Sequence, residues 1–467
     1  MSRTRPLLPL LVPLLVACLP GANEPPLMGT IHAARAEVVP DFSAWVPESA
    51  LPQPAPQAAE VRLERISAGV PWPRGIALVD DQLVVLARGR HRRAGGVDAS
   101  VADGSGCLFW VDPEISEPIE PGVPASERVR NNARLLAEPD GQVFQLHDTG
   151  LSPAADTHMD RPYCTLMLDA ASRNLFVCGF SGVDLPGAKF RKNATDSIHR
   201  FDLRVKRWFS VERHDAAVVP AAELSYVVPN NYYPHHDVEL SAPPHGWLNG
   251  PDGGCIAGEY LYCAGKDNHT VAQYDLEQIR ERPFAPAPPS RVVLGPRVTV
   301  SAPGRRQEME LLGPSAAAAR DGYLYLGYRT SSVIVRFRLD ERGALVRPAV
   351  AELIAVFEPW NAAAGRSASL IDMAFNSRGE LFVSCAKQGR IWKVGVPDPA
   401  RPFHGNDQEE RPTSAPPWVD LEAFTGQRTS TGNIVFDAKD RLYICVGNYD
   451  SGSQLAGAIY RATGSDC

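Results

Sequence analysis

Six short apolar segments, each beginning with Leu, recur along the chain. They read Leu83–Leu86, Leu175–Cys178, Leu261–Cys263, Leu324–Leu326, Leu381–Ser384 and Leu442–Cys445. Each follows another apolar segment across a turn that contains Asp, Gly or Asn, and each precedes a third segment in which apolar and polar residues alternate. Short alternating segments separated by turn residues are typical of β-strands. The pattern therefore predicts an all-β protein.

The regular recurrence is an internal repeat of three or four strands, which predicts a six-bladed β-propeller. A fourth strand can be placed before each new repeat, at Val143–Leu146, Leu224–Val227, Arg291–Leu294, Leu353–Val356 and Trp418–Leu421. No such segment follows Ala458–Arg461 in the last repeat. Residues 61–66 precede the first repeat and have no other partner, so we predict that they pair with the last blade. This pairing would close the ring and hide two sheet edges.

Three segments that begin innermost strands carry a family resemblance: Arg74–Leu78, Ile371–Phe375 and Gly432–Phe436. Together with the turns and strands that follow them, they resemble the NHL-type and gluconolactonase-type six-bladed propellers. The resemblance spans residues 60–467 and implies the fold, not an activity. In gluconolactonases a Glu of the first blade, with an Asn and an Asp of later blades, holds a divalent metal. The matching segment Val70–Arg74 has no carboxylate, so that metal site is not implied here.

The N-terminus has the pattern of an export signal. Arg3 and Arg5 precede an apolar run, Leu7–Leu19, that is too short to span a membrane. Leu15–Cys18 resembles a bacterial lipobox, which implies that Cys18 is lipidated. Cleavage after Ala36, with loss of Cys18, is the alternative.

The domains expected are a signal peptide at 1–18, a Pro- and Ala-rich tether at 19–59 and the propeller at 60–467. We expect an exported protein of the periplasm or cell surface, attached to a membrane by its lipid alone. With a net charge of −7, the chain is not expected to bind nucleic acid. We expect a monomer.

Cysteine content agrees with export, because eight cysteines remain when Cys18 is set aside. Cys164 and Cys178 lie symmetrically about a turn, which predicts a disulfide across a hairpin. Cys255 and Cys263 also flank a tight turn and form a second candidate pair. A strict two-residue turn would pair Cys255 with Tyr262, so this second disulfide requires a bulge.

In a propeller, the start of each innermost strand and the loop after each second strand open onto one face around the central channel. The residues expected there are rich in cations and amides, which suits a small polar or anionic ligand, or a protein partner. The candidate ligand-binding residues are Arg74, Arg88, Arg90, Lys266, Arg329, Lys387 and Asn448.

A cluster of His and Asp residues is expected on the same face. Asn231–Asp237 contains His235, His236 and Asp237 at the start of blade 3. His158 lies at the matching strand start of blade 2, and His269 lies in a loop of blade 3. Imidazole and carboxylate groups bind divalent metals, or provide a His base oriented by Asp. We expect a metal at His158, His236, His269 and Asp237, with His236 and Asp237 as catalytic candidates. The alternative is that these histidines are packed and hydrogen-bonded.

Three functions remain open on this sequence. The first is an exported cell-envelope propeller that binds a ligand or partner on its channel face. The second is a metal- or His-dependent hydrolase or lyase of the lactonase type. The third is a quinoprotein sugar dehydrogenase. Six-bladed members of that type combine a His base with Arg, Lys and Asn contacts to an anionic quinone and a Ca²⁺ ion, and His235 or His236, Arg329, Lys387 and Asn448 would fill these roles. Motifs of zinc proteases, serine hydrolases of the elbow type, P-loop proteins, dinucleotide-binding folds and c-type cytochromes are absent from the sequence.

Overall fold

The computed structural model divides the chain into two units, Met1–Val38 and Val39–Cys467. All residues that the structure describes belong to the second unit: 61–70, 72–87, 90–94, 97–101, 107–137, 163–179, 197–209, 251–266, 269–281, 291–357, 368–386, 389–405, 415–427, 429–448 and 457–464. None of the helices in these ranges is long and apolar enough to cross a membrane.

Six sheets of the described residues form six blades, and the strands within each blade pair antiparallel. Blade 1 consists of β2 (Pro73–Val79), β3 (Gln82–Ala87), β6 (Cys107–Val111) and β8 (Ala133–Ala137); blade 2 of β9 (Tyr163–Asp169), β10 (Asn174–Gly179), β11 (Ser197–Asp202) and β12 (Arg207–Phe209); blade 3 of β13 (Pro251–Ala257), β14 (Tyr260–Gly265), β15 (Thr270–Asp275) and β16 (Arg291–Leu294).

Blade 4 consists of β19 (Pro314–Arg320), β20 (Tyr323–Tyr328), β21 (Val333–Arg338) and β22 (Val350–Phe357); blade 5 of β23 (Leu370–Phe375), β24 (Leu381–Cys385), β25 (Arg390–Gly395) and β27 (Val419–Asp420); blade 6 of β28 (Thr429–Phe436), β29 (Leu442–Asn448), β30 (Gly457–Thr463), β1 (Arg62–Val70) and β7 (Glu117–Pro118). In the described ranges, three short helices lie between strands: α2 (Glu127–Arg130), α4 (Leu276–Glu281) and α5 (Leu421–Thr425).

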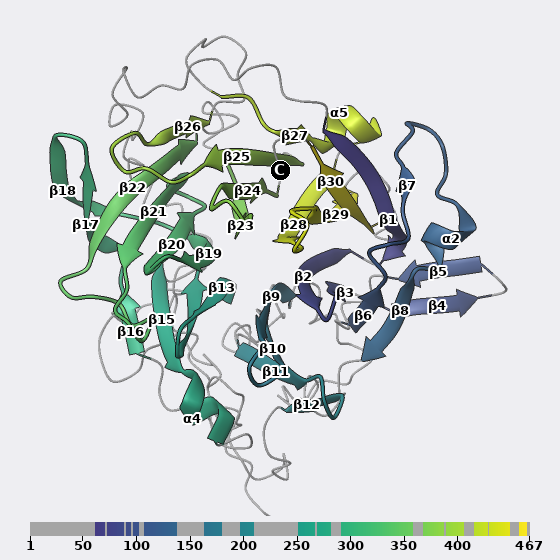
Figure 1. The fold of residues 1–467 in the computed structure, drawn as a ribbon, viewed down its shortest axis with the longest axis horizontal. Helices are drawn as coiled ribbons and strands as arrows, with labels where there is room; N and C mark the ends of the chain where they lie inside the picture. The colour runs from purple at the N-terminus through teal and green to yellow at the C-terminus, as the bar shows by residue number, and fades with distance from the viewer. Residues whose placement is uncertain are drawn as a thin grey trace, which may run out of the picture. The chain divides into compact units, whose positions relative to one another are not determined.

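The first strands of the blades form a closed cycle. Each of β2, β9, β13, β19, β23 and β28 contacts the next, and β28 contacts β2, as Figure 1 shows around a common centre. We call these six strands the inner strands. Six buried apolar clusters fill the interfaces between neighbouring blades, one at each interface. The six-bladed propeller predicted from the repeat is therefore confirmed.

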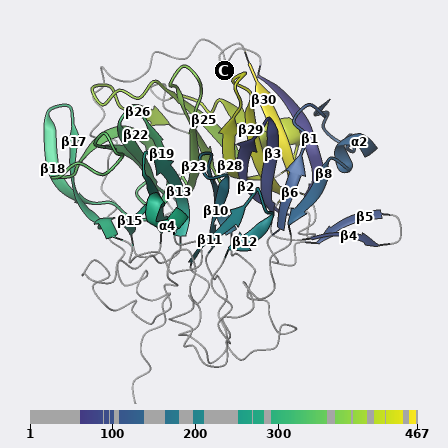
Figure 2. The same ribbon diagram turned by 60° about the horizontal axis from the view of Figure 1, so that its bottom comes forward.

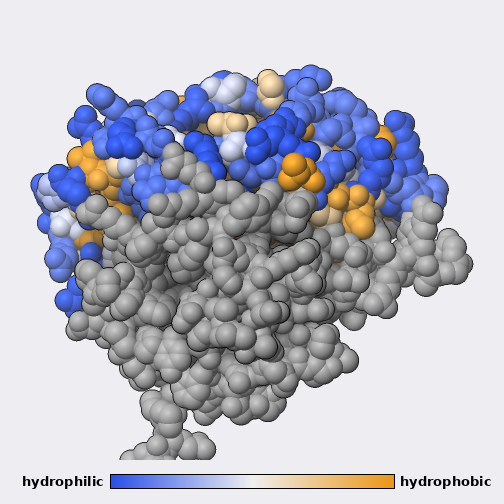
Figure 3. All heavy atoms as spheres, turned by 90° about the horizontal axis from the view of Figure 1, so that it is seen from below, coloured by the Kyte–Doolittle hydropathy of each residue, from blue (hydrophilic) through white to orange (hydrophobic). Residues whose placement is uncertain are grey.

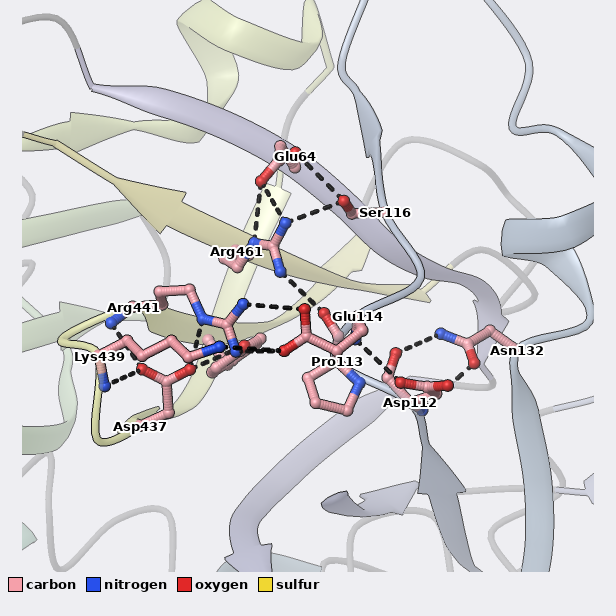
Figure 4. Close-up of polar contacts among 11 residues, drawn as sticks. Glu64, Asp112, Pro113, Glu114, Ser116, Asn132, Asp437, Lys439, Arg441 and Arg461 are labelled. Atoms are coloured by element: carbon pink, nitrogen blue, oxygen red, sulfur yellow. Dashed lines mark hydrogen bonds and ion pairs between the residues drawn. The ribbon is translucent and has the colours of Figure 1, made fainter. Parts of the chain in front are cut away.

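The predicted closure is also confirmed, because β1 pairs with β30. Leu63 lies opposite Ala462 and Arg65 opposite Tyr460. Arg461, on β30, donates hydrogen bonds to Glu64 on β1 at 2.8 and 2.6 Å (Figure 4). The alternating burial of β1 explains its place, since Leu63 and Ile66 enter the interfaces of blade 6 with both of its neighbours.

Two insertions lie on the outside of the blades. The β4 (Arg90–Ala94) and β5 (Val97–Val101) hairpin follows β3, and the β17 (Arg297–Ala302) and β18 (Arg305–Glu310) hairpin joins the outer strand β22 of blade 4, which also pairs with β26 (Phe403–Gly405). Figure 2 shows the two hairpins at opposite sides of the ring.

Among the described residues, the fourth strand of blade 1 is β8 and that of blade 2 is β12. The outer strands predicted at Val143–Leu146 and Leu224–Val227 lie outside the described residues. Outer strands contact one neighbour only, so their apolar pattern is weak: residues Arg134 and Leu135 of β8 are both exposed. The fourth strands predicted for blades 3, 4 and 5 coincide with β16, β22 and β27.

The predicted disulfides are absent from this structure, in which Cys178, Cys255 and Cys263 are thiols. The register of the β9–β10 hairpin, unbroken from Asn174 opposite Asp169, places Cys178 opposite Thr165, and Cys164 occupies the bulge that follows; the side chain of Cys164 is outside the described part. Cys263 lies opposite Gly254, and Cys255 opposite Tyr262, so the bulge that this pair required does not occur between them. The strand registers therefore correct both pairings.

The described surface is mainly polar. Its exposed large apolar side chains are Val123, Leu135, Val205, Val346 and Val396. Figure 3 shows apolar residues only in small separate groups among polar ones on the face that it views.

Candidate functional site at the ring centre

Every inner strand has a bulge near its first end, where it pairs with the second strand of its blade. The pairing skips one residue of the inner strand in blades 1 to 5 and two in blade 6. The bulged residues are Arg74, Cys164, Asp252, Ser315 and Ile371 in blades 1 to 5, and the pair Gly432 and Asn433 in blade 6. A bulge changes the direction of a side chain and ends regular pairing. Most polar contacts at the ring centre come from these residues and the ones that follow them.

A chain of hydrogen bonds crosses the ring centre. Asn433 of blade 6 donates through Nδ2 to Thr165 Oγ1 of blade 2 at 3.1 Å. Thr165 in turn donates to the carbonyl oxygen of Asp252 in blade 3 at 2.9 Å. Blades 6 and 2 are not neighbours, because blade 1 lies between them in the cycle. The contact of Asn433 with Thr165 therefore spans the centre and does not follow the wall.

Asp372 joins this chain from blade 5. Its Oδ2 accepts a hydrogen bond from the backbone N–H of Ile434 at 2.9 Å. Burial raises the pKa of the Asp372 carboxyl to about 7, although hydrogen bonds from Ile434 and Asn433 and the charge of Arg74 act in the opposite direction. A carboxyl of this kind changes its protonation near neutral pH, so it can serve as a proton donor or acceptor.

Arg74 lies on the other side of β28. Residue Arg74 is 8% exposed, and its Nε has no hydrogen-bond partner in the part of the chain that the structure describes. Gly432 permits this approach, since a Cβ there would lie 2.7 Å from the carbonyl oxygen of Arg74. Other buried polar atoms nearby on β28 and just before β23 also have no partner among the described residues: Oγ or Oγ1 of Ser369, Thr429, Ser430 and Thr431, and Oδ1 of Asn433. Buried polar groups without partners are costly, so a cluster of them marks a place where a polar ligand gains hydrogen bonds.

A second group of charges surrounds Asp252. The side chain of Asp252 is 2% exposed, and its Oδ2 lies 3.8 Å from both Lys266 Nζ and Arg329 Nη1. Lys266 directly follows β14, and Arg329 directly follows β20, so both occupy the loops that the propeller brings to this end of the strands. Two cations share one carboxylate here, which leaves a net positive charge.

The structure describes the side chains of only some of the ligand-binding residues predicted from the sequence. Arg74, Lys266 and Arg329 lie at the ring centre as described above. Arg90 belongs to β4 and Asn448 to β29, but their side chains are outside the described part, as are Arg88 and Lys387 altogether. Cys18 also lies outside it.

Of the predicted metal cluster, only His269 is described. Its Nδ1 accepts a hydrogen bond from the backbone N–H of Gly313 at 3.0 Å, so this nitrogen is engaged in joining blades 3 and 4. His158, His236 and Asp237 lie outside the described residues, and the cluster stays a prediction. No group of three or more His, Cys, Asp or Glu side chains that could hold a metal occurs in the described ranges.

The sequence reasoning missed Asp252, Asp372 and Thr165 as site residues. A signal for part of the site does exist. Three inner strands begin with Pro, then a polar residue that is bulged, then a small residue: Pro73–Gly75, Pro251–Gly253 and Pro314–Ala316. This recurrence would have singled out Asp252 beside Arg74.

A separate cavity of about 430 Å³ lies at the opposite ends of the strands, near the turn of blade 2. Its charged lining is largely paired internally: Arg280 donates to Asp169 at 2.9 and 2.8 Å, and Arg204 pairs with Asp202 at 2.7 Å. The ring centre, whose buried polar atoms have no partner among the described residues, is therefore the stronger candidate.

No family model and no curated protein matches the chain. Solved structures similar to it include a PQQ-bound aldose sugar dehydrogenase from Streptomyces coelicolor, with 13% identity, coverage of 88% of this chain and 100% of that chain, and a TM-score of 0.41. A gluconolactonase from Xanthomonas campestris has 13% identity, coverage of 89% and 93%, and a TM-score of 0.38. Virginiamycin B lyase from Staphylococcus aureus has 10% identity, coverage of 86% and 99%, and a TM-score of 0.35. The resemblance concerns the fold alone.

Proposed function

We propose that the protein is an exported propeller of the cell envelope that binds a small anionic molecule carrying hydroxyl groups at the ring centre. The observation that carries this proposal is the group of buried polar atoms around Arg74 and β28 that have no hydrogen-bond partner among the described residues. Arg74 offers a guanidinium fork suited to a carboxylate. The hydroxyl groups of Ser430 and Thr431 and the amide oxygen of Asn433 suit the hydroxyl groups of a ligand.

Charge supports the anionic character of the ligand. The chain as a whole carries a net charge of −7. At the ring centre, in contrast, Arg74, Lys266 and Arg329 outnumber the carboxylates Asp252 and Asp372. A cationic region in an acidic protein attracts anions and favours them over neutral sugars of the same shape.

The test is calorimetric titration of the purified full-length chain with sugar acids, such as gluconate and glucuronate, and with glucose as the neutral match. We expect saturable binding of a sugar acid that weakens as salt is raised. Arg74→Met should weaken it about ten- to a hundredfold, the value of one charge-assisted hydrogen bond. Arg401→Met removes a cation from an exposed ion pair with Asp398 and is the matched control. Failure of every sugar acid to bind would contradict the proposal.

The cellular location is a separate part of the proposal and depends on the N-terminal sequence. If Cys18 is lipidated, Cys18→Ser should release the protein from the membrane fraction. Unchanged fractionation, with a mature N-terminus directly after Ala36, would favour ordinary secretion.

A hydrolase or lyase is the second candidate, and Asp372 favours it. A buried carboxyl with a pKa of about 7 can transfer a proton to a substrate at the ring centre. Lactone hydrolysis that is lost in Asp372→Asn, while sugar-acid binding is retained, would favour this candidate. Metal analysis of the purified protein distinguishes further alternatives: a stoichiometric transition metal favours the metal-dependent enzyme, and Ca²⁺ with a quinone absorbance favours the quinoprotein.

A further inference from the structure

Two buried thiols from neighbouring blades contact each other. Cys178 lies on β10 of blade 2 and Cys263 on β14 of blade 3, and their Sγ atoms are 3.3 Å apart. Neither side chain is exposed. Both belong to the apolar cluster between these blades, together with Phe176 and Leu261. The two residues are 85 positions apart in the sequence, so no local pattern brings them together.

The backbone at this interface is arranged for a close approach. Gly254 lies opposite Cys263 on β13, and a Cβ at this position would lie 2.6 Å from Met167 Sδ of blade 2. The absence of a side chain there lets blade 2 pack directly against blade 3. A disulfide requires a sulfur separation of about 2.05 Å, so the two Sγ atoms need to approach by roughly 1.2 Å. Small rotations of two cysteine side chains are sufficient for a movement of this size.

We infer that Cys178 and Cys263 form a disulfide that links blades 2 and 3 when the chain folds in the presence of a disulfide oxidant. This inference builds on the proposed export, because the cell envelope is the compartment in which such oxidants act. One cysteine thiolate attacks the oxidant's disulfide, which releases a first thiol and leaves a mixed disulfide. The second thiolate attacks that mixed disulfide and releases the second thiol. Two electrons and two protons pass from the cysteines to the oxidant's sulfur atoms.

The bond forms before the interface is complete. In the folded protein, hydrogen bonding to Cys263 and burial raise the pKa of the Cys178 thiol well above its ordinary value. A buried thiol with a raised pKa is a poor nucleophile, because the thiolate is the reactive form. The oxidant therefore acts while blade 3 is still docking onto blade 2, and a folded reduced protein is expected to resist oxidation.

The test uses the full-length protein, unfolded and reduced, then refolded in a glutathione redox buffer. Remaining thiols are alkylated under denaturing conditions, and the digest is examined by mass spectrometry without reduction. We expect a peptide containing Cys178 joined to one containing Cys263, lighter than the sum of the two by two hydrogen atoms. Protein isolated from the cell envelope should carry the same link. Refolding does not depend on where the cell delivers the chain, so this arm separates failure of the disulfide from failure of the proposed export.

Two variants make the outcome decisive. In the parent protein, refolding with a reductant should give a lower melting temperature than refolding in the redox buffer. In Cys178→Ser, Cys263 should be alkylated and the two melting temperatures should be equal. In Cys255→Ser, the link between Cys178 and Cys263 and the difference in melting temperature should both remain. Alkylation of both Cys178 and Cys263 in the refolded parent protein, or linkage of Cys178 to Cys164 or of Cys263 to Cys255, would overturn the inference.

Discussion

Arg461→Met should weaken the closure of the ring strongly, because Arg461 joins the two ends of the described chain. Its Nε and Nη2 atoms bind Glu64 on β1 at 2.8 and 2.6 Å. Nη1 donates to the carbonyl oxygen of Pro113 at 2.8 Å, and Nη2 also donates to Ser116 Oγ at 2.9 Å (Figure 4). Methionine keeps most of the apolar stem but removes every one of these donors.

The magnitude follows from burial. Removing one partner of a buried ion pair costs roughly 3–5 kcal/mol, since the other charge is left without compensation. The side chain of Arg461 is 9% exposed, but that of Glu64 is 26% exposed and can regain part of its hydration in the variant. We therefore expect a loss of about 2–4 kcal/mol in the free energy of unfolding, below the upper end of the range for a fully buried pair.

Urea unfolding measures this loss, and hydrogen exchange locates it. The amides of β1, such as those of Leu63 and Arg65, should exchange faster in Arg461→Met than in the parent protein, ahead of those in blades 3 and 4. Arg401→Met is the control, because Arg401 is 73% exposed and its ion pair with Asp398 should contribute about 0–1 kcal/mol. Equal losses in the two variants, or unchanged exchange in β1, would refute the reasoning.

Three further predictions concern the ring centre. Burial raises the pKa of Asp372 from 3.8 to about 7, so between these pH values the folded protein keeps a proton that the unfolded chain releases. The free energy of unfolding should therefore fall by on the order of 4 kcal/mol as pH rises from about 4 to 7. In urea unfolding, Asp372→Asn should remove this part of the pH dependence. Gly432→Ala should cost about 1–3 kcal/mol through contact with Arg74, whereas Gly295→Ala, with open space around it, should not destabilise. Lys266→Met should reduce the salt dependence of sugar-acid binding measured by titration; an unchanged salt slope would exclude Lys266 from the site.

The inner strands could be predicted from the sequence because apolar alternation and turn residues recur in every blade. Closure could be predicted because residues 61–66 had an apolar pattern and no partner. Both are properties of regular strands, which local patterns describe well. Outer strands such as β8 and β12 could not be placed. Each pairs with a strand on one edge only, so packing requires few apolar residues at regular positions in its sequence.

The chemistry of the ring centre was harder to predict for a physical reason. Each bulge adds a residue to an inner strand, so counting alternate positions assigns side chains beyond the bulge to the wrong face. Asp372 lies directly after such a bulge, and Asp252 occupies one. Asp252 also lies between Pro251 and Gly253, a sequence that reads as a turn.

The cysteines illustrate a related limit. Symmetry about a turn compares positions within one hairpin, and it selected Cys164 for Cys178 and Cys255 for Cys263. The contact that the structure has, between Cys178 and Cys263, crosses from one blade to the next over 85 residues. Only the packing of whole sheets determines such a pair.

The pairing of β1 with β30 also sets a minimum time for folding during synthesis. Glu64 and Arg461 are 397 positions apart, so a ribosome that adds 5–20 residues per second needs roughly 20–80 s to produce the second after the first. During this interval β1 has no partner strand on the side where β30 will pair. The charged residues Arg62, Glu64 and Arg65 make its edge a poor template for other chains. Ring closure is therefore completed only after β30 has been translated, and the charged residues of β1 limit pairing of its edge with other chains until then.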